Sequence, residues 1–84
     1  MFLAKIYVTL KPAVNDPQGK TVLTGLQSLG FSDTKDVRIG KFLEITVDCS
    51  DIETATASIE DMCSKLLANP VIENYKFEVE QMDQ

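Results

Sequence analysis

The sequence predicts an α+β fold in which an antiparallel β-sheet carries two helices on one face. Three observations lead to this prediction. Segments at the two ends of the chain alternate apolar and polar residues, as half-buried strands do. Two internal segments repeat apolar residues at helical spacing along a single stripe. Two layers bury these one-sided elements most simply, close to a ferredoxin-like arrangement of order β-α-β(β)-α-β.

The first and last segments are expected to be strands. In residues 2–10 every second residue is apolar, so one face of the strand meets the core. Pro12 follows this strand and cannot continue it, because proline has no backbone N–H. In residues 71–80 the alternation places Tyr75, Phe77 and Val79 inward. Residues 81–84 are expected to be a frayed tail.

The first helix is expected to begin at Pro17 and to end before Gly30. Asp16 is a suitable N-cap, and proline fits the first helical position. Glycine fits the left-handed residue that closes a helix, which explains Gly30. Gly19 has two interpretations, because glycine in a first turn either weakens the helix or marks a close approach of another backbone segment.

Residues 36–48 contain the most ambiguous strand. A two-residue hairpin turning at Gly40 and Lys41 would place the apolar residues of its arms on opposite faces, which argues against it. Two alternatives keep the apolar residues together: a three-residue turn, or one long strand bent at Gly40. A long strand would extend beyond so small a domain and offer its free edge to a second copy.

Residues 50–68 form the clearest helix. Ser50 and Glu53 are expected to make a capping box, and Pro70 disfavours helical geometry at Asn69. An apolar stripe along this helix is expected to face the core. Its members are Ile52, Ala55, Ile59, Met62, Cys63, Leu66 and Leu67.

Size and charge exclude several classes of protein. The chain has 84 residues, with eight Lys or Arg, thirteen Asp or Glu and no His, for a formal net charge of −5. We expect one domain, residues 1–84, whose small core needs oligomerisation or a partner. The acidic balance argues against nucleic acid as a partner. No apolar run approaches the length of about 18 residues that spans a membrane, and no signal peptide is recognised, so we expect a cytoplasmic protein.

The residues suggest no catalytic, cofactor or metal site. The absence of His excludes imidazole as a base or ligand. Cys49 and Cys63 form no CxxC pair and are interpreted as structural. The carboxylates of the second helix are interpreted as a solvated face. Four basic residues at predicted turns and element ends are either scattered solubilising charge or a local rim for a phosphate or an acidic partner. They are Lys11, Lys20, Arg38 and Lys41.

Several uncommon strings occur in order along the chain. They include VTLKP, DPQGK, DVRIGK and LLANPVIE, within a resemblance that extends from Ala4 to about Glu80. In these strings the chain resembles the PurS family, the small subunits of phosphoribosylformylglycinamidine synthase. It departs from the family at Ala13, where glycine is common.

The resemblance implies an assembly subunit of a three-part amidotransferase of de novo purine synthesis. In that complex a glutaminase subunit releases ammonia. A large synthetase subunit uses ATP and Mg to convert formylglycinamide ribonucleotide to formylglycinamidine ribonucleotide. The small subunit carries no catalytic residues, binds no cofactor itself, brings the other two together and forms a homodimer or higher oligomer. The resemblance leaves open whether it also assists ammonia transfer.

Loops that carry the family-like strings are the expected partner contacts, because binding residues often lie in loops. The expected contact residues are Lys11, Asp16, Pro17, Gly19, Lys20, Arg38, Gly40, Lys41, Asn69, Pro70 and Glu73. The alternative function is a ligand-binding regulatory module of the ACT type, which shares the sheet-plus-helices layout, so fold alone does not separate the two.

Overall fold

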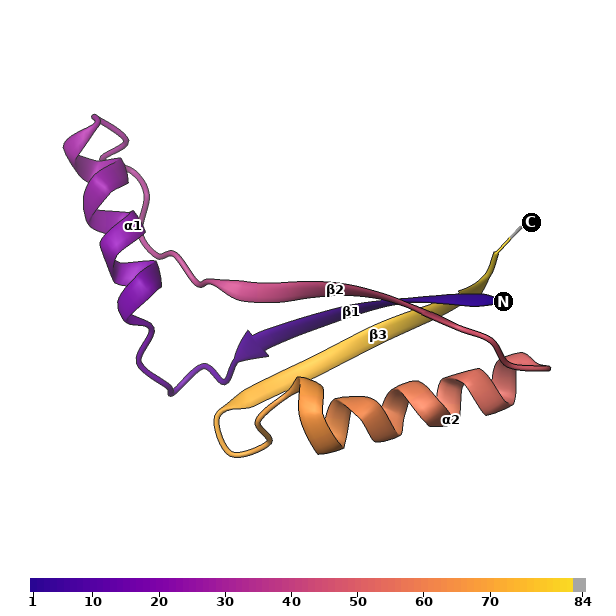
Figure 1. The fold of residues 1–84 in the computed structure, drawn as a ribbon. Coiled ribbons are helices and arrows are strands. Elements are labelled where there is room, and N and C mark those ends of the chain that lie inside the picture. The colour runs from indigo at the N-terminus through magenta and orange to yellow at the C-terminus, as the bar shows by residue number, and fades with distance from the viewer. Residues whose placement is uncertain (83–84) are drawn as a thin grey trace.

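A three-stranded antiparallel sheet forms the centre of the computed structural model, which describes residues 1–82 (Figure 1). Strand β1 (Phe2–Leu10) lies between β2 (Gly40–Val47) and β3 (Glu73–Gln81), in the order β2-β1-β3. Both outer strands pair antiparallel to β1. The predicted antiparallel sheet and the order β-α-β-α-β are therefore confirmed.

The core lies between this sheet and helix α2 (Ile52–Met62), which runs along one face. Strand β1 directs its even-numbered side chains toward α2, and Ala4, Ile6 and Val8 are fully buried. From α2 and the turn after it, Ile59 and Cys63 are fully buried against them. Tyr75, Phe77 and Val79 pack against the same core from β3, as predicted.

The N-terminal cap of α2 differs from the prediction. Asp51, not Ser50, is the N-cap, and its carboxylate accepts a hydrogen bond from the Thr54 amide at 2.8 Å. This bond lowers the pKa of the Asp51 carboxyl. The predicted capping box was wrong because two good capping residues are adjacent, and the helix begins after the second.

A π-helical turn, η1 (Cys63–Leu67), continues α2 and changes which residues face the core. The Ala68 amide donates to the Cys63 carbonyl five residues earlier, at 3.0 Å. Leu67 packs against the core, whereas Leu66 is 83% exposed. The predicted apolar stripe is therefore correct in the middle of the helix, but Leu66 and Ile52 at its ends are exposed.

The middle segment is a single strand. Residues 36–39 lead into β2 without forming a strand, so the hairpin alternative is wrong. The alternative of a single strand is correct, but the strand is shorter than predicted: β2 begins at Gly40 instead of bending there. Gly40 pairs with Thr9, and a Cβ at this position would lie 2.5 Å from the Val8 carbonyl oxygen. The glycine therefore allows the two backbones to approach closely.

Helix α1 (Pro17–Ser28) forms as expected but does not lie on the sheet. Asp16 is its N-cap, and Gly30, with φ of 101°, follows its C-terminus. The Phe31 amide donates to the Leu26 carbonyl at 3.0 Å, as in a Schellman motif. The helix projects beyond the end of the sheet (Figure 1). The predicted placement of both helices on one face is wrong, because the segments on both sides of α1 carry it away from the body.

The projecting helix makes the molecule unusually extended. The radius of gyration is 16.6 Å, whereas a compact domain of this length is expected near about 12 Å. The accessible surface is 5965 Å², against about 5,000 Å² from the scaling for compact monomers. One copy thus leaves about 1,000 Å² more surface in water than a compact chain of its size would.

The first and last described residues of the chain lie side by side. Gln81 pairs with Phe2, and the Met82 amide donates to the Met1 carbonyl at 3.0 Å. The expectation of a frayed tail from residue 81 is therefore wrong for residues 81 and 82, and residues 83–84 lie outside the described residues. Strand β3 begins at Glu73 instead of residue 71, after a turn in which the Glu73 amide donates to the Asn69 carbonyl. Within residues 1–82, no helix has the length and apolar character needed to cross a membrane.

The packing predicts unequal effects for two apolar truncations on the α2–η1 helix. Ile59→Ala removes a fully buried side chain and should lower the free energy of unfolding by about 2–5 kcal/mol. Leu66→Ala, at an exposed position, should change it by less than about 0.5 kcal/mol. Urea unfolding at one fixed protein concentration measures both. Equal losses would contradict the core described above.

Candidate interaction surface

Three segments, made of loops and the first residues of β2 and β3, meet at the end of the sheet from which α1 projects. We call residues 11–16, 36–40 and 69–73 the loop junction. The Lys11 amide donates to the Ile72 carbonyl at 2.8 Å. The Arg38 guanidinium donates to the carbonyls of Lys11 and Val14, at 3.0 and 2.9 Å. A groove of about 460 Å³ runs between the three segments.

Asp16 is the best-connected side chain of the loop junction. It is 4% exposed, and its two carboxylate oxygens bind different parts of the chain. Oδ1 accepts from the Gly19 amide at 2.9 Å, and Oδ2 accepts from the Ile39 amide at 2.8 Å. The bonds from Ile39 and Gly19 hold the pKa of the carboxyl below its ordinary value. One carboxylate thus joins the start of α1 to the residue preceding β2.

Gly19 lies where the backbone of the second segment comes closest to α1. A Cβ at this position would collide with the Val37 carbonyl oxygen, which confirms the close-approach interpretation of this glycine. Gly25, on the same helix, has open space around it. Within α1 the requirement for glycine therefore applies to Gly19, where the helix meets the loop junction, and not to Gly25.

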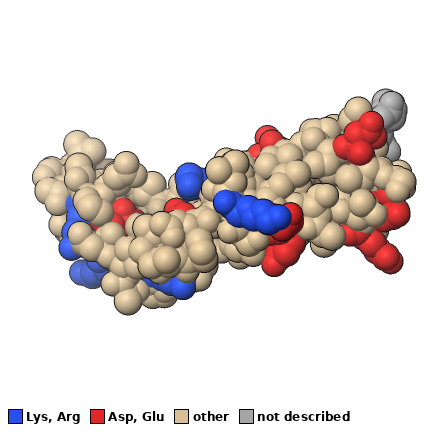
Figure 2. Space-filling view, turned by 60° about the horizontal axis from the view of Figure 1, so that its bottom comes forward, with Lys and Arg blue, Asp and Glu red and all other residues tan. Residues whose placement is uncertain are grey.

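Basic side chains gather at the α1 end of the molecule (Figure 2). Residues 11–41 carry five Lys or Arg and three Asp. The rest of the chain carries three Lys or Arg and ten Asp or Glu. Two members of the predicted basic rim already have partners. Arg38 binds loop carbonyls, and Lys41 lies 3.8 Å from Glu73. Glu73 also accepts from the Asn69 amide at 2.7 Å. Two residues of the predicted basic rim therefore hold the loops together.

The predicted contact residues come together in space although they are far apart in the sequence. Most lie in the loop junction, and the remainder flank it at the start of α1 or at the start of β2. The flanking residues are Pro17, Gly19, Lys20 and Lys41, and those within it are Lys11, Asp16, Arg38, Gly40, Asn69, Pro70 and Glu73. Contact of these residues with a partner stays a prediction.

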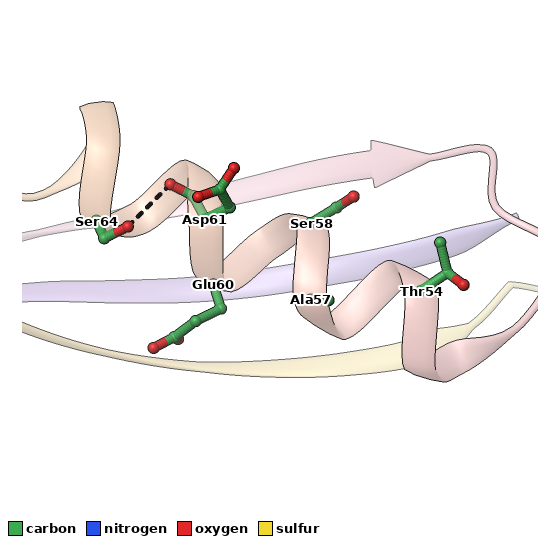
Figure 3. Close-up of a pocket in the computed structure, with 6 residues that line it drawn as sticks. All are labelled: Thr54, Ala57, Ser58, Glu60, Asp61 and Ser64. Carbon is green, nitrogen blue, oxygen red and sulfur yellow. Dashed lines mark hydrogen bonds between the residues drawn. The ribbon is translucent and has the colours of Figure 1, made fainter.

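The solvent-facing side of α2 presents a shallow hollow, lined by Thr54, Ala57, Ser58, Glu60, Asp61 and Ser64 (Figure 3). The labelled side chains diverge from the helix instead of converging on one point. Ser64 donates to the Asp61 carbonyl at 3.1 Å, and Asp61 also pairs with Lys65 at 2.9 Å. Beside this hollow, the Tyr75 hydroxyl donates to Glu60 at 3.1 Å, which raises the tyrosine pKa. Within residues 1–82, no three His, Cys, Asp or Glu side chains form a group able to hold a metal ion.

One feature of the surface was missed by reasoning from the sequence. Tyr7 and Phe42 are cross-strand neighbours whose ring centroids lie 5.0 Å apart, on the sheet face opposite α2. The alternation in each strand shows which residues share a face, but only the register of β1 against β2 brings these two rings together.

The fold and the loop junction define the class: a small α+β module in which an antiparallel sheet is backed by one helix and a second helix projects from its end. The family model described as "PurS: Phosphoribosylformylglycinamidine (FGAM) synthase" matches residues 3–81. The chain therefore belongs to the PurS family, and the resemblance inferred from the sequence strings is confirmed.

Relatives and solved structures agree with this assignment. The chain is 49% identical to the phosphoribosylformylglycinamidine synthase subunit PurS of Synechocystis over 94% of this chain and 79% of that one. It is 46% identical to the Bacillus subtilis subunit over 98% and 96%. The crystal structure of PurS from Methanocaldococcus jannaschii superposes with a TM-score of 0.88 at 37% identity, over 99% and 100% of the two chains. A chain of the PurLQS structure from Thermotoga maritima superposes with a TM-score of 0.83 at 27% identity, over 95% and 99%.

The carboxylate bridge predicts a pH-dependent contribution to stability from Asp16. Because its folded-state pKa is depressed, this carboxylate stabilises the fold fully above about pH 4 and loses that effect as the pH falls through the folded-state pKa. Asp16→Asn should therefore be less stable at neutral pH and show a flatter decline in acid. Urea unfolding across the acid range measures this, with exposed Asp33→Asn as the matched control. Parallel profiles for Asp16→Asn and the unmodified chain would contradict the bridge.

The two glycines of α1 predict opposite effects of the same substitution. Gly19→Ala should destabilise the chain because the added Cβ collides with the Val37 carbonyl. Gly25→Ala should stabilise it by up to about 1 kcal/mol, because alanine is the better helix former and the site is open. Thermal unfolding of both variants gives the comparison, and a stabilising Gly19→Ala would rule out the close approach.

Proposed function

We propose that this chain is the non-catalytic assembly subunit of a phosphoribosylformylglycinamidine synthase complex in de novo purine biosynthesis. Its curated relatives are named as PurS subunits of that synthase, and a structural relative belongs to a PurLQS assembly. The observation that carries the proposal is the extended shape, in which one copy leaves α1 and much of the sheet uncovered. A subunit whose surface is completed by other chains fits this geometry.

In this proposal the chain bridges a glutaminase subunit and a large ATP-dependent synthetase subunit. ATP and Mg are used by the complex and are not bound by this chain. The loop junction, where the family-like strings converge, is the proposed contact for those subunits. We place the chain in the cytoplasm with the other subunits. The alternative of an ACT-like regulatory module is not favoured, because the PurS family model covers residues 3–81.

Self-association is the second part of the proposal. The outer edges of β2 and β3 are unpaired within one described copy, since β1 is the middle strand. The projecting end of the chain exposes apolar side chains, with Leu29 at 75% and Phe31 at 54%. The excess exposed surface of about 1,000 Å² is comparable to the roughly 800 Å² that each partner buries in a stable interface. A homodimer or higher oligomer that forms through the edges of β2 and β3 would cover this excess surface.

Reconstitution tests the assembly role directly. The purified chain is mixed with a cognate synthetase subunit and glutaminase, and glutamine-dependent formation of formylglycinamidine ribonucleotide is measured. Product formation should require this chain, and activity unchanged by its omission would refute the proposal. Size-exclusion chromatography with light scattering tests self-association, and a monomeric mass at micromolar concentration would contradict the edge pairing.

A further inference from the structure

The face of the sheet opposite α2 has no helix over it within the described residues (Figure 1). We call it the open face. The register of the strands places eleven side chains on it, in rows that cross all three strands. They are Leu3, Lys5, Tyr7, Thr9, Phe42, Glu44, Thr46, Asn74, Lys76, Glu78 and Glu80.

Aromatic side chains form the centre of the open face. Tyr7 on the middle strand lies opposite Phe42 on one side and Lys76 on the other. The Lys76 ammonium is 5.4 Å from the Tyr7 ring centroid, and the Phe42 ring lies on the other side of Tyr7. Phe42 is 53% exposed although it sits within a strand. A large aromatic group held in a fixed geometry and left in water is typical of an anchor for protein recognition.

Carboxylates adjoin this aromatic row, and the open face carries three Glu against two Lys, for a formal net charge of 2 − 3 = −1. Lys5 lies opposite Glu44 on β2 and Glu78 on β3, and it pairs with Glu80 at 3.3 Å. Within residues 1–82, neither Glu44 nor Glu78 has a Lys or Arg nitrogen within 4.0 Å. One lysine is therefore surrounded by three carboxylates, two of which are available to a partner.

The neighbouring hollow is too small for a cofactor. A depression of about 130 Å³ lies beside the aromatic row, lined by Tyr7, Thr9, Asn74, Tyr75 and Lys76. Small-molecule sites usually enclose at least about 300 Å³. A depression of this size suits one side chain of another protein.

We propose that the open face docks a basic surface of a partner subunit, with a partner arginine stacked on Phe42 and paired with Glu44. Phe42 and Glu44 are two residues apart on one strand face, a separation of about 7 Å that one guanidinium can bridge. A guanidinium over an aromatic ring is attracted to it, and its planar fork matches a carboxylate. The inference rests on the proposed function, because it assumes that the chain joins a complex.

Charge favours a different protein over a second copy on this face. Each open face carries Glu44, Glu78 and Glu80 against Lys5 and Lys76, so two copies placed face to face would bring together surfaces of the same net sign, which is unfavourable across an interface. A basic patch would instead neutralise the free carboxylates.

Binding of purified variants to the synthetase and glutaminase subunits tests the inference, with affinity measured by calorimetry at two salt concentrations. Phe42→Ala should weaken assembly by about tenfold or more, as for an anchor residue. Glu44→Gln should weaken it by about fivefold and reduce its dependence on salt. Matched controls on the α2–η1 helix are Leu66→Ala and Asp61→Asn, which should bind within about twofold of the unmodified chain.

The outcomes separate the two proposals. If the unmodified chain does not join the complex, the proposed function fails and the docking inference fails with it. If it joins and the open-face variants bind like the controls, only the docking inference is overturned. If Phe42→Ala or Glu44→Gln instead separates copies of this chain in the absence of other subunits, the face is a self-interface and the inference is wrong. Thermal unfolding of each variant confirms that weakened binding does not reflect unfolding.

Discussion

The Asp16 carboxylate determines where the projecting helix leaves the body of the protein. It caps α1 through Gly19 and accepts the amide of Ile39 just before β2, so one side chain joins two segments that are 23 residues apart. Arg38 strengthens the same junction through loop carbonyls. The position of α1 relative to the sheet depends on these few bonds, because α1 has little packing of its own against the core.

This geometry fits the proposed role of the chain as part of a larger assembly. A compact domain of this order would fold its first helix back over the sheet, whereas here, within residues 1–82, α2 and the turn after it supply the second layer. The cost is exposed apolar surface on α1 and two unpaired strand edges. The same arrangement separates charge, with basic residues around the projecting end and acidic residues over the body. The molecule thus presents chemically different surfaces to its surroundings.

Much of this structure is predictable from local sequence signals. The alternation of β1, the Asp16 cap and the stripe around Ile59 each depend on neighbouring residues, and each was predicted correctly. The position of α1 was not predicted correctly. Its amphipathic pattern specifies that the helix has an apolar face, but not which chain covers that face. The Tyr7–Phe42 pair and the convergence of the three loops depend on strand register and long-range hydrogen bonds, for which the sequence has no short-range signal.

The central claim is that other chains cover the surfaces that one copy leaves open. Hydrogen exchange of α1 and strand-edge amides tests this most directly, comparing the free chain at high dilution with the chain assembled with synthetase and glutaminase. The account predicts rapid exchange along α1 in the dilute chain and marked slowing on assembly, together with protection of the outer amides of β2 or β3. Identical exchange rates in the free and assembled chain would contradict it.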